Sequence, residues 1–198
     1  MANQPWDAGT WSVEPVATSR VGGDLVVTAR EGSDAWRVTA HGYITDSAHA
    51  LLAPMTTDTA IEVSFVADFD QQFDQAGLML RASETQWIKA GVEFADGVLQ
   101  LGAVVTRQTS DWSSGPVDWA GREVTVNASR SGNAVMIRAR VNDEPFRLVR
   151  LAWVDPSVDF AAGPYLAAPT NAELSVRFTG WRTGPAEETI HPDGLPDF

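Results

Sequence analysis

The sequence contains no cysteine among its 198 residues, and it has no long apolar run. Without cysteine the chain can form no disulfide, no thiol nucleophile and no cysteine-based zinc site. No apolar run approaches the roughly 18 residues that cross a bilayer. The first residues, MANQPWDAGTW, also lack the basic and apolar segments of a secretory signal. We therefore expect a cytoplasmic protein that makes no membrane contact.

Positive charge is also scarce, since the formal net charge is -12. Nucleic acid is held mainly by lysine and arginine that neutralise its phosphates, so we expect no nucleic-acid partner. Of the 14 basic residues 13 are arginine, and only Lys89 is lysine, which is typical of a GC-rich coding genome and leads us to expect a bacterial source. Lys89 either survives by chance or has a role that arginine cannot fill. Its place in the stretch described below favours a specific role.

The sequence lacks the motifs of nucleotide-dependent and metal-dependent enzymes. It has no P-loop, dinucleotide fingerprint, HExxH or nucleophile elbow, so we predict no cofactor. Asp68, Asp70 and Asp74 could gather around calcium, but the run lacks the glycine and final glutamate of an EF-hand loop, so we expect no metal. The three histidines show no metal-ligand spacing: His41, His49 and His191.

What is present indicates an all-β protein. Short strand-like patterns are separated by Gly, Asp, Asn and Pro, and no segment sustains a helical period. We predict a single domain over residues 1–183, followed by an unpacked acidic, proline-rich tail over 184–198. Because each sheet would have one apolar face to bury, the expected fold is a two-sheet antiparallel jelly-roll sandwich. An irregular barrel is the competing architecture.

Residues 73–93, FDQAGLMLRASETQWIKAGVE, are the most informative stretch of the chain. Two runs of alternating apolar and polar residues are joined by a polar turn, which predicts two paired strands. The predicted core face carries six apolar residues: Ala76, Leu78, Leu80, Ile88, Ala90 and Val92. The other face gathers an amide, an aromatic ring, cations, a carboxylate and two glycines: Gln75, Gly77, Met79, Arg81, Trp87, Lys89, Gly91 and Glu93. That mixture is typical of a binding surface.

The segments around this stretch complete the predicted sheets. Asp96-Gly97 predicts a tight turn that pairs residues 98–106 with the strand of Lys89. Alternation over residues 36–43 predicts a strand with Trp36 on its apolar side and His41 on its polar side. Residues 107–119, which contain SDWSSG, are expected to form a long loop, and residues 154–170 a crossing between sheets.

At FDQAGLMLR, WIKAGVEF, WRVTAHGY and SDWS, the chain resembles a family of bacterial and fungal proteins of unknown function. The family is regulation-of-enolase-like and similar to domains appended to some glycoside hydrolases. The resemblance covers roughly residues 6–181 and implies a concanavalin A-like jelly roll. Lectins and glucanases of this fold hold sugars on a concave sheet. By motif, these positions match the family: Arg37, Asp74, Gln75, Trp87, Lys89, Glu93, Asp111 and Trp112.

The preferred hypothesis is lectin-like, non-catalytic binding of a small polar ligand on the concave sheet, with a carbohydrate as the favoured ligand class. Trp87 and Trp112 would stack on sugar rings, and Glu93 would bond hydroxyl groups together with its polar neighbours. The expected ligand-binding residues are Arg37, Gln75, Trp87, Lys89, Glu93, Asp111 and Trp112. Against this stand two structural alternatives, in which the tryptophans are buried and the polar groups only satisfy one another.

Two further hypotheses remain open at this point. A glycosidase-like or other sugar-active enzyme would use Glu93 with a second acid, Asp74 or Asp111, because glycoside hydrolysis needs two carboxylates. The closely spaced Glu-x-Asp-x-Glu motif of such glucanases is absent. The family resemblance also raises the hypothesis of a protein partner, with the chain as an interacting regulator of a metabolic enzyme.

Overall fold

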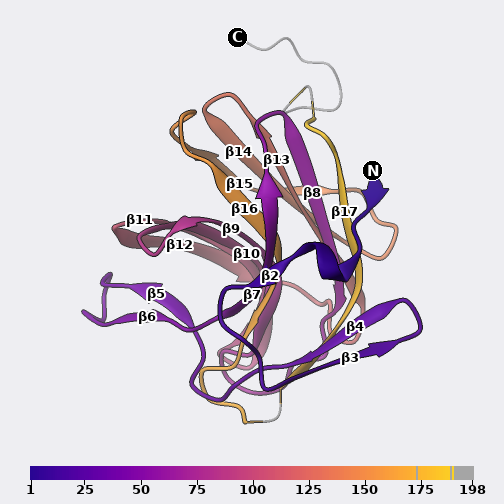
Figure 1. Ribbon diagram of the computed structural model, residues 1–198. Coiled ribbons are helices and arrows are strands. Elements are labelled where there is room, and N and C mark those ends of the chain that lie inside the picture. The colour runs from indigo at the N-terminus through magenta and orange to yellow at the C-terminus, as the bar shows by residue number, and fades with distance from the viewer. Residues whose placement is uncertain (173, 188, 190–198) are drawn as a thin grey trace.

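The protein, seen as a computed structural model, is described over residues 1–172, 174–187 and 189 (Figure 1). Its strands pair in antiparallel fashion into two large sheets and one small hairpin. The back sheet runs in the order β15 (Arg147–Trp153), β14 (Ala134–Val141), β13 (Glu123–Ser131), β8 (Thr59–Val66), β17 (Ser175–Pro185), β4 (Asp24–Thr28) and β3 (Ala17–Val21), and β1 (Ala2–Asn3) also pairs with β17.

The site sheet runs in the order β12 (Thr109–Pro116), β11 (Val98–Arg107), β10 (Gln86–Ala95), β9 (Gln75–Ser83), β16 (Phe160–Ala167), β7 (His49–Met55) and β2 (Thr10–Trp11). A short 3-10 helix, η1 (Trp6–Ala8), precedes β2. The two sheets face each other across an apolar core. This is the all-β, two-sheet antiparallel jelly-roll sandwich of concanavalin A type that the sequence predicts. Within the described residues no helix is long and apolar enough to cross a membrane.

The core confirms the alternation predicted for residues 73–93. The predicted apolar residues of β9 and β10 are each at most 3% exposed, and they pack in one cluster with side chains of the back sheet such as Val63, Phe65 and Phe178. Because successive side chains of a strand point to opposite faces, burying this set turns Gln75, Lys89 and Glu93 to the outer face of the site sheet.

Three glycines lie in one row across the site sheet. Gly91 pairs with Gly77 on β9 and with Gly102 on β11. A Cβ atom on Gly91 would lie 2.1 Å from the carbonyl oxygen of Ala76, so only glycine allows the strands to approach this closely. On the next strand Tyr165 pairs with Gly77 and therefore projects from the same outer face, where the row of glycines leaves room for its ring.

The strand predicted over residues 36–43 is wrong. The structure has a hairpin instead, in which β5 (Ala35–Arg37) pairs with β6 (Ile44–Asp46) and with no other strand of the described chain. The connecting turn places Val38, Ala40 and Gly42 at positive φ, which no regular strand contains. We call residues 35–46 the arm, because Figure 1 shows it projecting beside the sandwich next to β11 and β12.

Two other segments differ from their predicted structure. The loop expected over residues 107–119 contains β12, an edge strand paired with β11 along its whole length after a tight turn at Gln108. The crossing expected over residues 154–170 contains β16, which lies in the sheet between β9 and β7. Almost every residue of β16 is buried, so the strand shows no polar-apolar alternation in the sequence.

The predicted tail lies largely outside the described residues, which omit 188 and 190–198. Strand β17 continues to Pro185, so the first two residues of the predicted tail belong to the back sheet. The predicted domain limits of 1–183 and 184–198 stay a proposal.

Candidate functional site

A cavity of about 270 Å³ lies on the outer face of the site sheet, beside the arm. Its floor comes from β9, β10 and β11, one wall comes from the arm and the residue before it, and the rest of the rim comes from neighbouring segments. The floor residues are Gln75, Lys89, Glu93 and Val104. The wall residues are Asp34, Trp36, His41 and Tyr43. The other rim residues are Phe73, Trp112, Pro169 and Thr170.

Lys89 is the centre of a buried polar network in the floor. Its side chain is 5% exposed, and its Nζ donates to Gln75 Oε1 at 2.7 Å and to Asp34 Oδ1 at 3.1 Å. Gln75 Nε2 donates to the same Asp34 oxygen at 3.4 Å and to the carbonyl of Phe73 at 3.2 Å. A buried ammonium group is costly unless it is paired and hydrogen-bonded, and Asp34 and Gln75 together meet that need.

Glu93 shares the floor but not the network. It pairs across the strands with Gln75 and Gln100, yet within the described part of the chain its carboxylate has no hydrogen bond and no ion pair. Burial raises the pKa of Glu93 from 4.5 to about 7, and the charges of Asp34 and Asp96 add to this, while Lys89 acts in the opposite direction. Glu93 therefore changes its charge near neutral pH, which is common at binding and catalytic sites.

Tyr165 lies beside this floor and was not predicted as a site residue. Its side chain is 3% exposed and shares a small depression with Lys89, Glu93 and Gly91. Burial, followed by the charges of Glu93 and Asp34, raises the pKa of the Tyr165 hydroxyl well above its usual value. Among the described residues this hydroxyl has no hydrogen-bond partner. Tyr165 lies in the segment of residues 154–170, which the sequence predicts only as a crossing between sheets.

The cavity wall is aromatic. The rings of Trp36 and Trp112 have centroids 6.4 Å apart and lie perpendicular at 89°. The Trp36 Nε1 group donates to the carbonyl of Thr39 at 2.9 Å, which fixes this ring within the arm. His41 stacks on Tyr43 with centroids 5.6 Å apart. Trp36 was expected on the apolar side of a strand, and that placement is wrong, because the turn of the arm brings the ring to the cavity.

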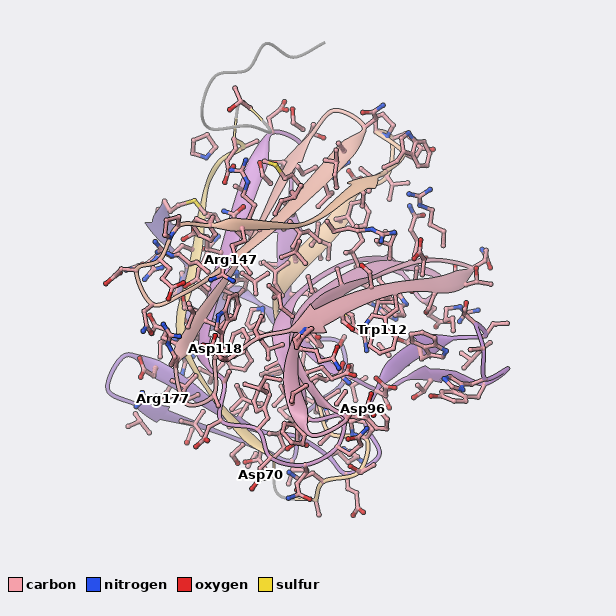
Figure 2. The ribbon with its side chains drawn as sticks, turned by 180° about the vertical axis from the view of Figure 1, so that it is seen from behind. Asp70, Asp96, Trp112, Asp118, Arg147 and Arg177 are labelled. Carbon is pink, nitrogen blue, oxygen red and sulfur yellow. The ribbon has the colours of Figure 1, made fainter. Side chains whose placement is uncertain are left out.

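The structure brings together four of the seven predicted ligand-binding residues. Gln75, Lys89, Glu93 and Trp112 line the cavity, although their role in binding stays a prediction. Figure 2 shows Trp112 on the side of the molecule that carries the arm. The other three residues lie elsewhere.

Trp87 is on the predicted face but is 1% exposed, covered by a cluster that includes Ala35 of the arm. The guanidinium of Arg37 donates to the carbonyl of Gln108 at 3.2 Å, and its backbone nitrogen donates to Ser110 Oγ at 3.0 Å, so Arg37 attaches the arm to the edge of the sheet. Asp111 points to Arg150, with which it forms an ion pair at 2.8 Å.

Asp34 lines the cavity and was not predicted as a site residue. It lies in the turn before the arm and meets Lys89 across a separation of 55 residues. The only signal was a turn-like Gly-Ser-Asp run just before Trp36. A contact between such distant residues depends on how the turn packs against the sheet. Alternation within one strand does not specify this packing.

The aspartates considered for calcium occupy a different pocket, beside the segment that leads into β9, lined by Asp68, Asp70 and Asp74 with Asn171. Asp74 is 1% exposed and accepts a hydrogen bond from Asn171 at 2.9 Å, and burial raises its pKa. Asp74 is not among the residues that line the cavity with Glu93. Across the described residues no group of three or more His, Cys, Asp or Glu side chains could hold a metal ion.

Comparisons with known proteins agree with this architecture. A family model described as "Protein of unknown function (DUF1349)" matches residues 11–186. Regulation of enolase protein 1 from Saccharomyces cerevisiae is 29% identical over 190 residues, which cover 96% of each chain.

Solved structures with a similar fold include a yeast protein and part of a bacterial enzyme. A functionally unknown protein from Saccharomyces cerevisiae has a TM-score of 0.87 at 28% identity, with 93% of this chain and 100% of that chain covered. A xylan β-1,4-xylosidase from Bacillus halodurans C-125 has a TM-score of 0.70 at 14% identity, covering 92% of this chain but 39% of the enzyme. At that identity the likeness shows the fold alone.

Proposed function

Because the chain belongs to the DUF1349 family of proteins of unknown function, we propose its function from the cavity rather than from a relative. The protein binds a small polar ligand, a carbohydrate, on the outer face of the site sheet, and it catalyses no reaction on that ligand. The observation that carries this proposal is the placement of two perpendicular tryptophan rings, Trp36 and Trp112, beside a floor of polar side chains.

A sugar ring matches both parts of this cavity. Its C–H faces suit an aromatic plane, and its hydroxyl groups suit the amide of Gln75 and the carboxyl of Glu93, which lie next to each other across β9 and β10. Trp112 is 47% exposed, so its ring remains available to a ligand. The cavity volume of about 270 Å³ is at the small end of ligand sites, which favours one or two sugar units over a long chain.

The positions of the carboxylates favour binding without hydrolysis. Neither Asp74 nor Asp111, the partners considered for Glu93, lines the cavity. The second carboxylate there is Asp34, and its Oδ1 already accepts hydrogen bonds from Lys89 and Gln75 and one from the backbone nitrogen of Ala35 at 2.7 Å. A carboxylate held in this way supports the position of Lys89.

The test is a thermal unfolding series with mono- and oligosaccharides, using wild type, Trp112→Ala and Trp153→Ala. The two tryptophans are similarly exposed, at 47% and 51%, but only Trp112 lines the cavity. A ligand at 100 times its dissociation constant stabilises the folded state by about 2.7 kcal/mol. We expect one sugar class to stabilise wild type and Trp153→Ala but not Trp112→Ala. If no sugar raises the unfolding temperature of wild type, the carbohydrate proposal is wrong.

A second candidate function is a regulatory contact with another protein. The name of the yeast relative supports it, and so do exposed apolar side chains on edge strand β15, none of which lines the cavity. Leu148, Leu151 and Trp153 are 55%, 47% and 51% exposed there. Analytical ultracentrifugation with purified enolase would test this function. A complex that Trp153→Ala weakens and Trp112→Ala does not would establish it, and sedimentation as two separate species would exclude it.

We also propose a cytoplasmic location, as expected from the cysteine-free sequence. Cell fractionation with an antibody against the chain tests this directly.

A further inference from the structure

The charges that line the cavity do not balance. Two carboxylates, Asp34 and Glu93, share the lining with one lysine, Lys89. Lys89 lies 3.1 Å from Asp34 Oδ1 and forms its ion pair there. Glu93 has no hydrogen bond or ion pair within the described chain, and it lines the cavity with its side chain partly buried. His41 is the other lining group that can carry positive charge, and its ring stacks on Tyr43.

A neutral ligand would raise the free-energy cost of the unpaired Glu93 charge. Any ligand that covers the floor removes water from Glu93, and a buried carboxylate without a partner must take up a proton or pay the cost of an unsolvated charge. A ligand with a positive charge removes the problem, because it supplies the missing partner. A ligand with a negative charge would be repelled by Glu93.

The aromatic wall favours the same kind of ligand. Cations are attracted to the faces of tryptophan and tyrosine rings within about 6 Å of the ring centre. Trp36, Tyr43 and Trp112 all line the cavity, and Tyr43 is 50% exposed. Burial, followed by the charges of Asp34 and Glu93, raises the pKa of the Tyr43 hydroxyl, so Glu93 interacts electrostatically with this ring. The net charge of -12 also attracts cations over longer distances.

From this arrangement we infer that the cavity takes an amino sugar, with its charged nitrogen beside Glu93 and its ring against Trp36 and Trp112. The inference rests on the proposed carbohydrate binding and narrows it to one class of sugar. Gln75 Oε1 accepts one hydrogen bond from Lys89 and has a second lone pair for a neighbouring hydroxyl, since Gln75 pairs with Glu93 across β9 and β10. Lys89 stays bound to Asp34 and shapes the floor.

Calorimetric titration with four monosaccharides tests the inference at pH 7.5. The sugars are glucose, glucosamine, glucuronate, and glucosamine with its amine trimethylated, which keeps its charge at every pH. We expect the two charged amino sugars to bind at least tenfold more tightly than glucose, and glucuronate to bind most weakly. If glucose binds as tightly as both amino sugars, the inference is overturned while carbohydrate binding stands. If none of the sugars binds, both fail.

Variants separate the role of Glu93 from a general effect of charge. In Glu93→Gln the tenfold preference for the amino sugars over glucose should fall to near equality. Asp118→Asn is the matched control, because it removes the same charge from an exposed residue that Figure 2 places well away from Trp112, and it should keep the preference. A preference that persists in Glu93→Gln would overturn the inference.

A second measurement uses only the wild type, in case Glu93→Gln does not fold. A cation beside Glu93 lowers the pKa of that carboxyl from about 7, so binding should release protons near pH 7. Titrating the trimethylated sugar in two buffers with different ionisation enthalpies measures this release, because the sugar itself exchanges no proton on nitrogen. No release, or proton uptake, would contradict the placement of the charge beside Glu93.

Discussion

The Nζ atom of Lys89 lies 3.1 Å from Oδ1 of Asp34, and this contact joins the floor of the cavity to the base of the arm. The Lys89 side chain is 5% exposed and that of Asp34 18%, so the pair is largely withdrawn from water. Breaking a buried pair from one side leaves the other charge without compensation, which costs more than the pair contributed.

We predict that Lys89→Met lowers the free energy of unfolding by about 2–3 kcal/mol, since Asp34 and Gln75 both lose their partner. Urea denaturation measures the change. The control is Arg177→Met, which removes an arginine that is 54% exposed and lies 3.7 Å from Asp24. Exposed pairs of this kind contribute about 1 kcal/mol or less. Equal losses in the two variants would show that the Lys89 network is not structural.

Glu93 should make stability depend on pH. Its pKa is raised to about 7 in the folded chain against 4.5, so the folded state holds a proton that the unfolded state has lost. Stability therefore decreases as pH rises from about 4.5 to about 7 and levels off above, with a total loss of up to about 3 kcal/mol.

The measurement is the difference in unfolding free energy between wild type and Glu93→Gln across pH 4 to 9. We expect the unfolding free energy of Glu93→Gln to increase relative to that of wild type as pH rises through this window. At pH 8 Glu93→Gln should be the more stable protein. Taking the difference removes the contribution of Asp74, whose pKa is also raised and which is unchanged in both proteins. A difference that does not vary with pH would contradict the assigned state of Glu93.

The row of glycines predicts a steric effect. In Gly91→Ala the new Cβ would lie 2.1 Å from the carbonyl oxygen of Ala76 and 2.7 Å from the Cα of Gly77, which are backbone atoms that cannot rotate away. We expect a loss of about 3 kcal/mol in the free energy of unfolding. Gly115→Ala is the control, since a Cβ there meets nothing within 4 Å, and it should change stability by less than about 0.5 kcal/mol.

The arm should detach locally when its anchor is removed. Arg81 holds Asp46 at the end of the arm with two hydrogen bonds of 2.6 Å each. We predict that Asp46→Ala increases amide hydrogen exchange over residues 35–46 at least tenfold while exchange in β9 and β10 stays slow. Asp24→Ala, which removes an exposed ion pair on the back sheet, should leave exchange in the arm unchanged. If Asp46→Ala speeds exchange in both regions alike, the arm and sandwich unfold as one unit.

Alternation in the sequence was enough to predict the sandwich and part of its site. The pattern over residues 73–93 placed Gln75, Lys89 and Glu93 on one face correctly, because burying Ala76, Leu78 and their neighbours leaves no other choice. It also placed Trp87 on that face correctly but could not predict that the arm covers it, since burial on the outer face depends on a separate segment.

The arm itself could not be read from the sequence. Residues 36–43 alternate like a strand, but positive φ at Val38 and Ala40 turns the chain back, and neither residue type signals this. Asp34 and Tyr165 were missed for a related reason. Each reaches the floor through a pairing between distant segments, and one sequence does not reveal such pairings.

The strands of the arm pair only with each other within the described chain, and this affects how the ligand preference of the site can change among related proteins. Residues 38–43 pair with no other strand of the described chain, so changes there can alter what the cavity accepts without breaking the pairing of either sheet. The floor has no such freedom, because Gly91, Lys89 and Glu93 lie in the middle of paired strands. An exchange of the hairpin between relatives should therefore transfer ligand preference while each recipient keeps its own framework.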